Sequence, residues 1–168
     1  MNLNHIAKKP FFDLFYRSPC MAMILRAAYH DAGFCRSTVL GGSRATIRFP
    51  DELKRHENAG LEFAMEQIHE IQEDGNHIKA LLSYSDLIQL GGYAAVEYAG
   101  GPSMVFRMGR KDAEESDLPQ LTHGSTSSNM IEKVSSLGFS RREFVTLMGS
   151  HTIGFANMEV SGPQGRWT

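Results

Sequence analysis

The run from Leu25 to Gly33 places an arginine and a histidine four residues apart, at Arg26 and His30, with Tyr29 directly before the histidine. In a helix, side chains four residues apart project from one face, so the guanidinium and the imidazole would lie together. Such an imidazole can take a proton from a bound peroxide and return it to the departing oxygen, which typically speeds a reaction about 10²–10⁴-fold. The guanidinium would stabilise negative charge on that oxygen.

A second histidine of interest, His151, lies far along the chain in the run Gly149-Ser150-His151-Thr152-Ile153-Gly154. An imidazole is a common axial ligand of haem iron, so this histidine could hold iron on the side opposite His30. Spacing alone leaves the alternative open, because a histidine beside an arginine is more often a surface residue or a satisfied core residue. The two histidines therefore give a hypothesis that other features of the chain must support.

The composition is that of an ordinary globular chain: 168 residues, of which 42% are hydrophobic and 21% charged. This length favours one domain with a core. The net charge of −2 argues against a nucleic-acid binder, and the apolar runs are too short to predict a transmembrane segment. Two cysteines, Cys20 and Cys35, make neither a disulfide framework nor a four-thiolate metal site, and they fit a reducing compartment.

The predicted elements that must position these side chains are helical. Apolar periodicity and Gly33 predict a helix over residues 21–32, and a long amphipathic helix is predicted over residues 52–73. Capping-box patterns at Ser83 and Ser140 predict further helices over 83–99 and 140–148, and a weaker signal covers 129–137. Residues 101–128 read as a long loop. The fold class is therefore mainly α, and residues 1–17 are expected to be an N-terminal arm.

Several motifs, taken in order, resemble the class I haem peroxidases, most closely the ascorbate peroxidases and more distantly cytochrome c peroxidase. The matching segments are residues 25–33, Thr46-Ile47-Arg48-Phe49-Pro50 to Gly60, residues 83–97, Gly101-Pro102, Gly109-Arg110-Lys111-Asp112 and residues 147–154. The resemblance implies a haem-peroxidase-like helical domain over residues 18–168. By the same comparison, this domain would lack the last part of the proximal half, and the chain ends before a carboxylate that in the family supports the proximal histidine.

The resemblance implies a role for five residues on the distal side of a haem. His30 matches the acid–base histidine, and Arg26 matches the arginine that assists cleavage of the oxygen–oxygen bond. Asn58 matches the asparagine that orients the histidine, and Glu52 matches the carboxylate that holds that amide. Tyr29 stands where class I enzymes usually have a tryptophan, so an aromatic side chain is expected against the cofactor.

On the proximal side, the resemblance assigns His151 as the ligand of the haem iron and Trp167 as the tryptophan beside the haem. Thr152 and Thr168 match two residues of the family's proximal cation site. The implied cofactors are therefore haem b and a proximal monovalent or divalent cation.

Two hypotheses for function follow. The first is a haem peroxidase that reduces hydrogen peroxide with a small or protein reductant. Val160 and Ser18 stand where the family has the arginine and the lysine that serve ascorbate, so the resemblance does not assign ascorbate as that reductant. The second is a catalytically inactive, peroxidase-like accessory subunit, whose open proximal side a protein partner would cover in a larger assembly. The chain is expected inside the cell, with mitochondrion, chloroplast and cytoplasm left open.

Overall fold

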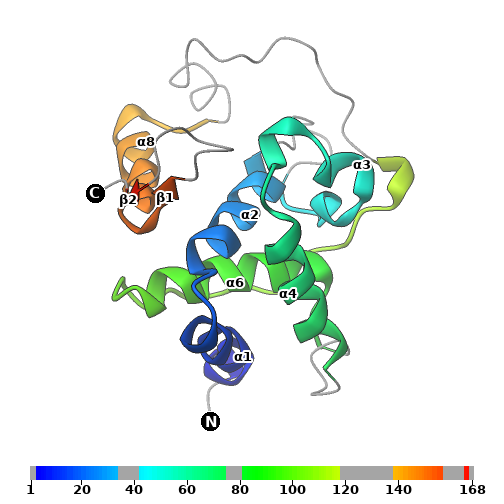
Figure 1. The fold of residues 1–168 in the computed structure, drawn as a ribbon, viewed down its shortest axis with the longest axis horizontal. Helices are drawn as coiled ribbons and strands as arrows, with labels where there is room; N and C mark the ends of the chain where they lie inside the picture. The colour runs from blue at the N-terminus through cyan, green and yellow to red at the C-terminus, as the bar shows by residue number, and fades with distance from the viewer. Residues whose placement is uncertain (1–2, 34–41, 75–80, 118–137, 157–164, 167–168) are drawn as a thin grey trace. The chain divides into compact units, whose positions relative to one another are not determined.

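The computed structural model describes residues 3–33, 42–74, 81–117, 138–156 and 165–166 (Figure 1). The chain divides into two compact units, residues 1–118 and residues 119–168. Both units are mainly helical in their described parts, which confirms the predicted fold class. None of the helices described is long and apolar enough to cross a membrane.

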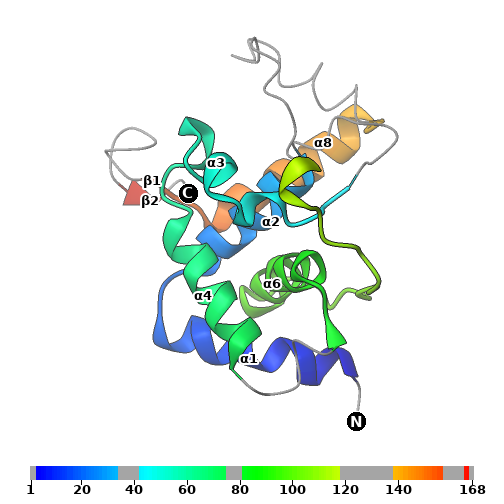
Figure 2. The same cartoon turned by 90° about the vertical axis from the view of Figure 1, so that its right-hand side faces the viewer.

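The first unit is built on helix α6 (Tyr84–Tyr98), which lies between α1 (Leu3–Arg17) and α2 (Met21–Gly33) (Figures 1 and 2). Helix α6 begins as predicted, because the Ser83 hydroxyl caps it by accepting a hydrogen bond from the amide of Asp86 at 3.0 Å. Helix α4 (Glu62–Glu73) also packs on α2 and α6. These contacts pack α2, the helix that carries His30, against both α6 and α4.

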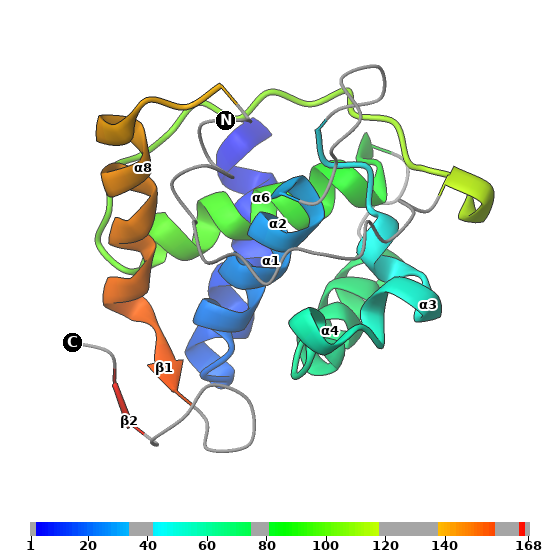
Figure 3. The same cartoon turned by 90° about the horizontal axis from the view of Figure 1, so that it is seen from above.

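Helix α2 crosses α6 at a point where α6 has two adjacent glycines (Figure 3). A β-carbon at Gly91 would lie 2.8 Å from Cγ2 of Ile24, and one at Gly92 would lie 2.8 Å from Cβ of Ala28. No side chain fits at these distances, so the glycines allow the two helix backbones to approach closely. The close approach fixes the position of α2, and with it the position of the candidate site.

Residues 3–17, expected as an N-terminal arm, form α1, and the apolar face of this helix is part of the core. Phe11, Leu14 and Phe15 are buried there, and Phe11 is fully buried. Burying an aromatic side chain of this size contributes about 1.5–3 kcal/mol. The structure therefore shows α1 as an integral element of the first unit.

The long helix predicted over residues 52–73 is wrong in its first half. The structure has a short helix α3 (Pro50–Leu53), a 3₁₀ turn η2 (His56–Asn58) and then α4. Gly60 interrupts the helix with a φ of 81°, a left-handed conformation that only glycine adopts readily. Another 3₁₀ turn, η1 (Thr46–Arg48), precedes α3, and η3 (Glu115–Asp117) follows the extended segment after α6. The interruption gives residues 54–61 the irregular backbone that the site uses.

The second unit contains α8 (Arg141–Met148), the 3₁₀ helix η4 (Gly149–Ile153) and two short antiparallel strands, β1 (Phe155–Ala156) and β2 (Gly165–Arg166). The predicted capping box at the start of α8 is confirmed. The amide of Ser140 donates to Glu143 Oε2 at 2.8 Å, and the amide of Glu143 donates to Ser140 Oγ at 3.3 Å. The helix predicted over residues 129–137 lies outside the described residues.

Candidate functional site

The imidazole of His30, in the last turn of α2, is held by the side chain of Asn58. The distance from His30 Nδ1 to Asn58 Oδ1 is 2.7 Å, and Asn58 is 1% exposed. The amide nitrogen of Asn58 in turn donates to the main-chain carbonyl of Glu52 at 2.8 Å. Because this second bond fixes the amide orientation, the Asn58 oxygen must accept from His30, and Nδ1 carries the proton. The other ring nitrogen, Nε2, then has the lone pair that a proton acceptor requires.

The contact to Glu52 differs from the one that the resemblance implies. The main-chain carbonyl of Glu52 holds the Asn58 amide, and the carboxylate does not. That carboxylate is buried, with Arg55 Nη1 4.0 Å from its Oε2, and neither oxygen accepts a hydrogen bond of ordinary geometry within the described residues. Burial raises the pKa of the Glu52 carboxyl, and the Thr46 hydroxyl and the Arg55 guanidinium only partly offset this.

Arg26 contacts the same segment of chain as His30. Its guanidinium donates from Nη2 to the carbonyl of Glu57 at 2.7 Å and from Nη1 to the carbonyl of Ala59 at 2.9 Å, on either side of Asn58. Burial lowers the pKa of Arg26, which stays a cation at neutral pH. A guanidinium has five N–H donors, so these two bonds leave donors for a developing negative charge. The side chains of Arg26 and His30 thus both contact residues 57–59, which agrees with their predicted position on one face of α2.

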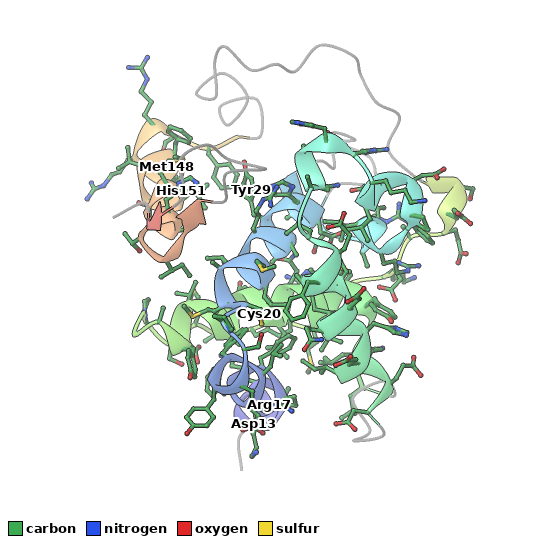
Figure 4. The ribbon with its side chains drawn as sticks, viewed as in Figure 1. Asp13, Arg17, Cys20, Tyr29, Met148 and His151 are labelled. Carbon is green, nitrogen blue, oxygen red and sulfur yellow. The ribbon has the colours of Figure 1, made fainter. Side chains whose placement is uncertain are left out.

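Tyr29 lies beside the histidine at the surface of α2. Its ring meets the His30 ring edge-on, with a distance of 5.7 Å between centroids and an angle of 72° between planes. The side chain is 47% exposed, and Figure 4 labels it on α2. An accessible aromatic wall therefore lies next to the oriented imidazole.

Asp31 is a residue of this site that the sequence reasoning missed. It follows His30 directly, it is 1% exposed, and its Oδ2 accepts a hydrogen bond from the amide of Ala45 at 3.1 Å. Burial raises the pKa of Asp31 to about 6, the charge of Glu52 acts in the same direction, and the amides that open η1 oppose both. A signal was present in the sequence, because a carboxylate in the last turn of a helix is disfavoured by the helix dipole unless it has a partner.

The residues that the resemblance assigns to the proximal side belong to the second unit. His151 lies half-buried in η4, beside Met148 at the end of α8 (Figure 4). Thr152 is exposed, and its hydroxyl donates to the carbonyl of Gly149 at 2.9 Å. Trp167 and Thr168 lie outside the described residues, as does Val160. Within the described residues, no three His, Cys, Asp or Glu side chains form a group that could hold a metal ion.

A family sequence model described as peroxidase matches residues 7–163 of this chain. The chain belongs to the peroxidase family. The match begins inside α1, so it includes the helix that packs on α6. Family membership implies a haem cofactor in general.

Curated relatives of this peroxidase-family chain are ascorbate peroxidases. A peroxisomal L-ascorbate peroxidase 5 of Arabidopsis thaliana is 40% identical over 153 residues, which are 89% of this chain and 53% of the relative. A probable peroxisomal L-ascorbate peroxidase 3 of Oryza sativa subsp. japonica is 36% identical over 96% of this chain and 55% of its own length. A cytosolic L-ascorbate peroxidase 2 of Arabidopsis thaliana is 37% identical, with shares of 96% and 64%. The chain spans about half the length of the first of these relatives.

These relatives confirm the resemblance to class I, ascorbate-peroxidase-like proteins that the motifs predicted. All of them are named as peroxidases, so the comparisons do not favour the hypothesis of an inactive accessory subunit. Their names place them in the peroxisome or the cytosol, and neither the mitochondrion nor the chloroplast appears among these three.

Proposed function

We propose that this chain binds haem b and uses it to reduce hydrogen peroxide with electrons from an external donor. The observation that carries the proposal is the chain of hydrogen bonds from His30 through Asn58 to the Glu52 carbonyl, which leaves Nε2 as the proton acceptor. A peroxide site needs an oriented, unprotonated imidazole nitrogen beside a cation, and Arg26 provides the cation. Family membership supports the same reaction class.

Taken unit by unit, the side-chain chemistry of the residues present fits a haem. His151, half-buried in η4, has the imidazole that commonly ligates haem iron, and the accessible ring of Tyr29 lies beside His30. His151 would hold the iron, and Trp167 would lie beside the cofactor. Thr152 and Thr168 would contribute to a cation site. When bound, the haem supplies the redox chemistry, which is the cofactor's own.

The part of this chain in the reaction is proton transfer and charge stabilisation. His30 Nε2 takes a proton from hydrogen peroxide, while the other proton stays on His30 Nδ1, and the hydrogen bond that Nδ1 donates to the Asn58 oxygen stabilises the imidazolium. The same nitrogen returns the proton to the departing oxygen, and N–H groups of Arg26 stabilise the charge on that oxygen. Hydrogen peroxide, two protons and two electrons give two molecules of water, and the external donor supplies the electrons.

We propose a small molecule or a protein as that donor, and a location inside the cell. Val160 and Ser18 replace the side chains that serve ascorbate in the family, so ascorbate itself is not part of the proposal.

The test is the visible spectrum of the purified chain with haemin, before and after hydrogen peroxide. We expect a histidine-ligated Soret band that shifts with peroxide, and His151→Ala should lose the ligated form. His30→Ala should keep the band and slow the shift by about 10²–10⁴-fold. His56→Ala, at an exposed histidine of η2, is the matched control and should react like wild type. Equal rates for wild type and His30→Ala would contradict the proposal.

A further inference from the structure

The contact between Asp31 and Ala45 lies one residue from the imidazole, yet the hydrogen bonds that orient the imidazole do not include it. The Asp31 carboxylate is buried, and its Oδ2 accepts from the Ala45 amide at 3.1 Å. Ala45 immediately precedes η1, so the bond ties the last turn of α2 to the start of that turn. The other oxygen, Oδ1, has no hydrogen-bond partner within the described residues.

Ala45 needs such a tie, because its backbone is in an unfavourable conformation. Its φ is 59°, in the left-handed region that a residue with a β-carbon rarely adopts. Such a conformation persists only where the surroundings hold it. The carbonyl of Ala45 accepts from Arg48 Nη1 at 2.9 Å, and Ala113 accepts from the same guanidinium at 2.6 Å. The Asp31 carboxylate is the contact that holds the amide side of Ala45.

Hydrogen bonds and short chain segments together form a closed circuit, which starts at Asp31 and ends at the adjacent residue of α2, His30. Asp31 accepts a hydrogen bond from the Ala45 amide, and the chain then continues through η1 to α3. There the Glu52 carbonyl accepts a hydrogen bond from the side-chain amide of Asn58. From Asn58 the circuit returns to His30. Only two residues, Phe49 and Pro50, connect η1 to the acidic turn of α3, so a displacement of η1 must displace the Glu52 carbonyl.

We propose that Asp31 is a positioning residue: by holding Ala45 it places the Glu52 carbonyl and the Asn58 amide, and thereby keeps His30 protonated on Nδ1. Its effect on peroxide chemistry rests on the function proposed above, but its effect on the imidazole is a property of the chain alone. The competing explanation is that Arg26 suffices, because its bonds to Glu57 and Ala59 also connect α2 to the segment that carries Asn58.

Nitrogen NMR of the chain labelled in its histidines separates the two explanations without haem. In wild type, His30 should show the form protonated on Nδ1. Asp31→Ala removes the acceptor, and the His30 signals should move to a mixture dominated by the Nε2-protonated form of a free imidazole. Asp31→Asn keeps an oxygen acceptor for the Ala45 amide and should restore the wild-type signals. Asp13→Ala, at an exposed carboxylate of α1 (Figure 4), is the control and should change nothing at His30.

Unchanged His30 signals in a folded Asp31→Ala chain would overturn the proposal and favour Arg26 as the sole support. If that variant does not fold, Asp31→Leu, which fills the space without an acceptor, takes its place in the comparison. Hydrogen exchange in wild type gives an independent test, because the Ala45 amide must be protected well beyond exposed amides. Rapid exchange there would refute the bond itself.

A peroxide assay of the haem-loaded variants distinguishes this proposal from the proposed function. We expect Asp31→Ala to react about 10–100-fold more slowly than wild type, and Asp31→Asn to react nearly as fast. If no variant reacts with peroxide but the NMR differences appear, the positioning role stands and the proposed function fails. If all variants react equally and their NMR spectra agree, the positioning role fails alone.

Discussion

Replacing Asp31 by asparagine should change how the stability of the first unit depends on pH. The carboxyl of Asp31 is 1% exposed, and burial raises its pKa from the ordinary 3.8 to about 6. The folded state therefore binds the proton more tightly than the unfolded state. Well below pH 3.8 the Asp31 carboxyl is protonated in both states and does not lower stability. As the pH rises, the unfolded chain ionises first, so the folded state loses stability until about pH 6, above which the loss is constant.

The size of this loss follows from the difference between the two pKa values. About two pKa units at about 1.4 kcal/mol each give a total loss of about 3 kcal/mol, of which about 2.5 kcal/mol falls between pH 4 and pH 7. An asparagine has no such loss. Its buried amide N–H groups lower stability by about 1–3 kcal/mol if they find no acceptor, but this cost is the same at every pH. The diagnostic quantity is therefore how the difference in the free energy of unfolding between Asp31→Asn and wild type changes with pH. This difference should rise, because wild type loses stability as the pH rises and Asp31→Asn does not.

Urea unfolding of both proteins at pH 4, 5, 6 and 7 measures this difference directly. The free energy of unfolding of Asp31→Asn, minus that of wild type, should rise by about 2.5 kcal/mol across the series and level off above pH 6. Glu52 also titrates with a raised pKa, but it is present in both proteins, so most of its effect cancels. Asp13→Asn, at the exposed carboxylate, should show a flat difference. A flat difference for Asp31→Asn as well would refute the conclusion that burial dominates at this carboxyl.

Three further predictions concern individual contacts. Asn58→Ala removes the acceptor of the His30 ring and should slow the reaction of the haem-loaded chain with peroxide about 10–100-fold, measured by stopped-flow absorbance, with the Soret band retained. Ala45→Val places a β-branched residue at a φ of 59° and should lower the free energy of unfolding by more than about 2 kcal/mol, whereas Ala45→Gly should stay within about 1 kcal/mol of wild type. Gly91→Ala puts a β-carbon 2.8 Å from side chains of α1 and α2 and should lower the free energy of unfolding by about 1–3 kcal/mol. Its control is Gly149→Ala, which has a φ of −57° and no neighbour within 4 Å, and which should be neutral or slightly stabilising.

The helices with strong local signals were predictable from the sequence. The caps at Ser83 and Ser140 act within four residues, so the starts of α6 and α8 agree with the structure. The helix predicted over residues 52–73 failed because apolar periodicity continues across Gly60, whose left-handed backbone ends one element before the next begins. The packing of the N-terminal segment is not predictable from local signals, because its apolar side chains pack on α6, which is distant in sequence.

The candidate site was predictable in its residue types and less so in its contacts. Helical spacing correctly placed Arg26 and His30 on one face, and Asn58 contacts the imidazole as the resemblance implied. No residue pattern indicates that Glu52 acts through its main-chain carbonyl, since every residue has one. Asp31 was missed for a similar reason: its partner is a backbone amide, which leaves no trace in the identity of Ala45.

The two glycines of α6 have a consequence for any attempt to redesign this protein. Because a β-carbon at Gly91 or Gly92 would collide with α2, the two helices fit together in one register, and a shift by one helical turn, about 5.4 Å, would bring larger residues into contact. The position of α2, the helix that carries His30, is therefore fixed by its packing on α6, and the face of α2 in that contact tolerates little change. Tyr29, on the outer face of the same helix, has room around it. Substitutions at Tyr29 can therefore widen or narrow access to the imidazole, or change the polarity of the surface beside it, while α2 keeps its position.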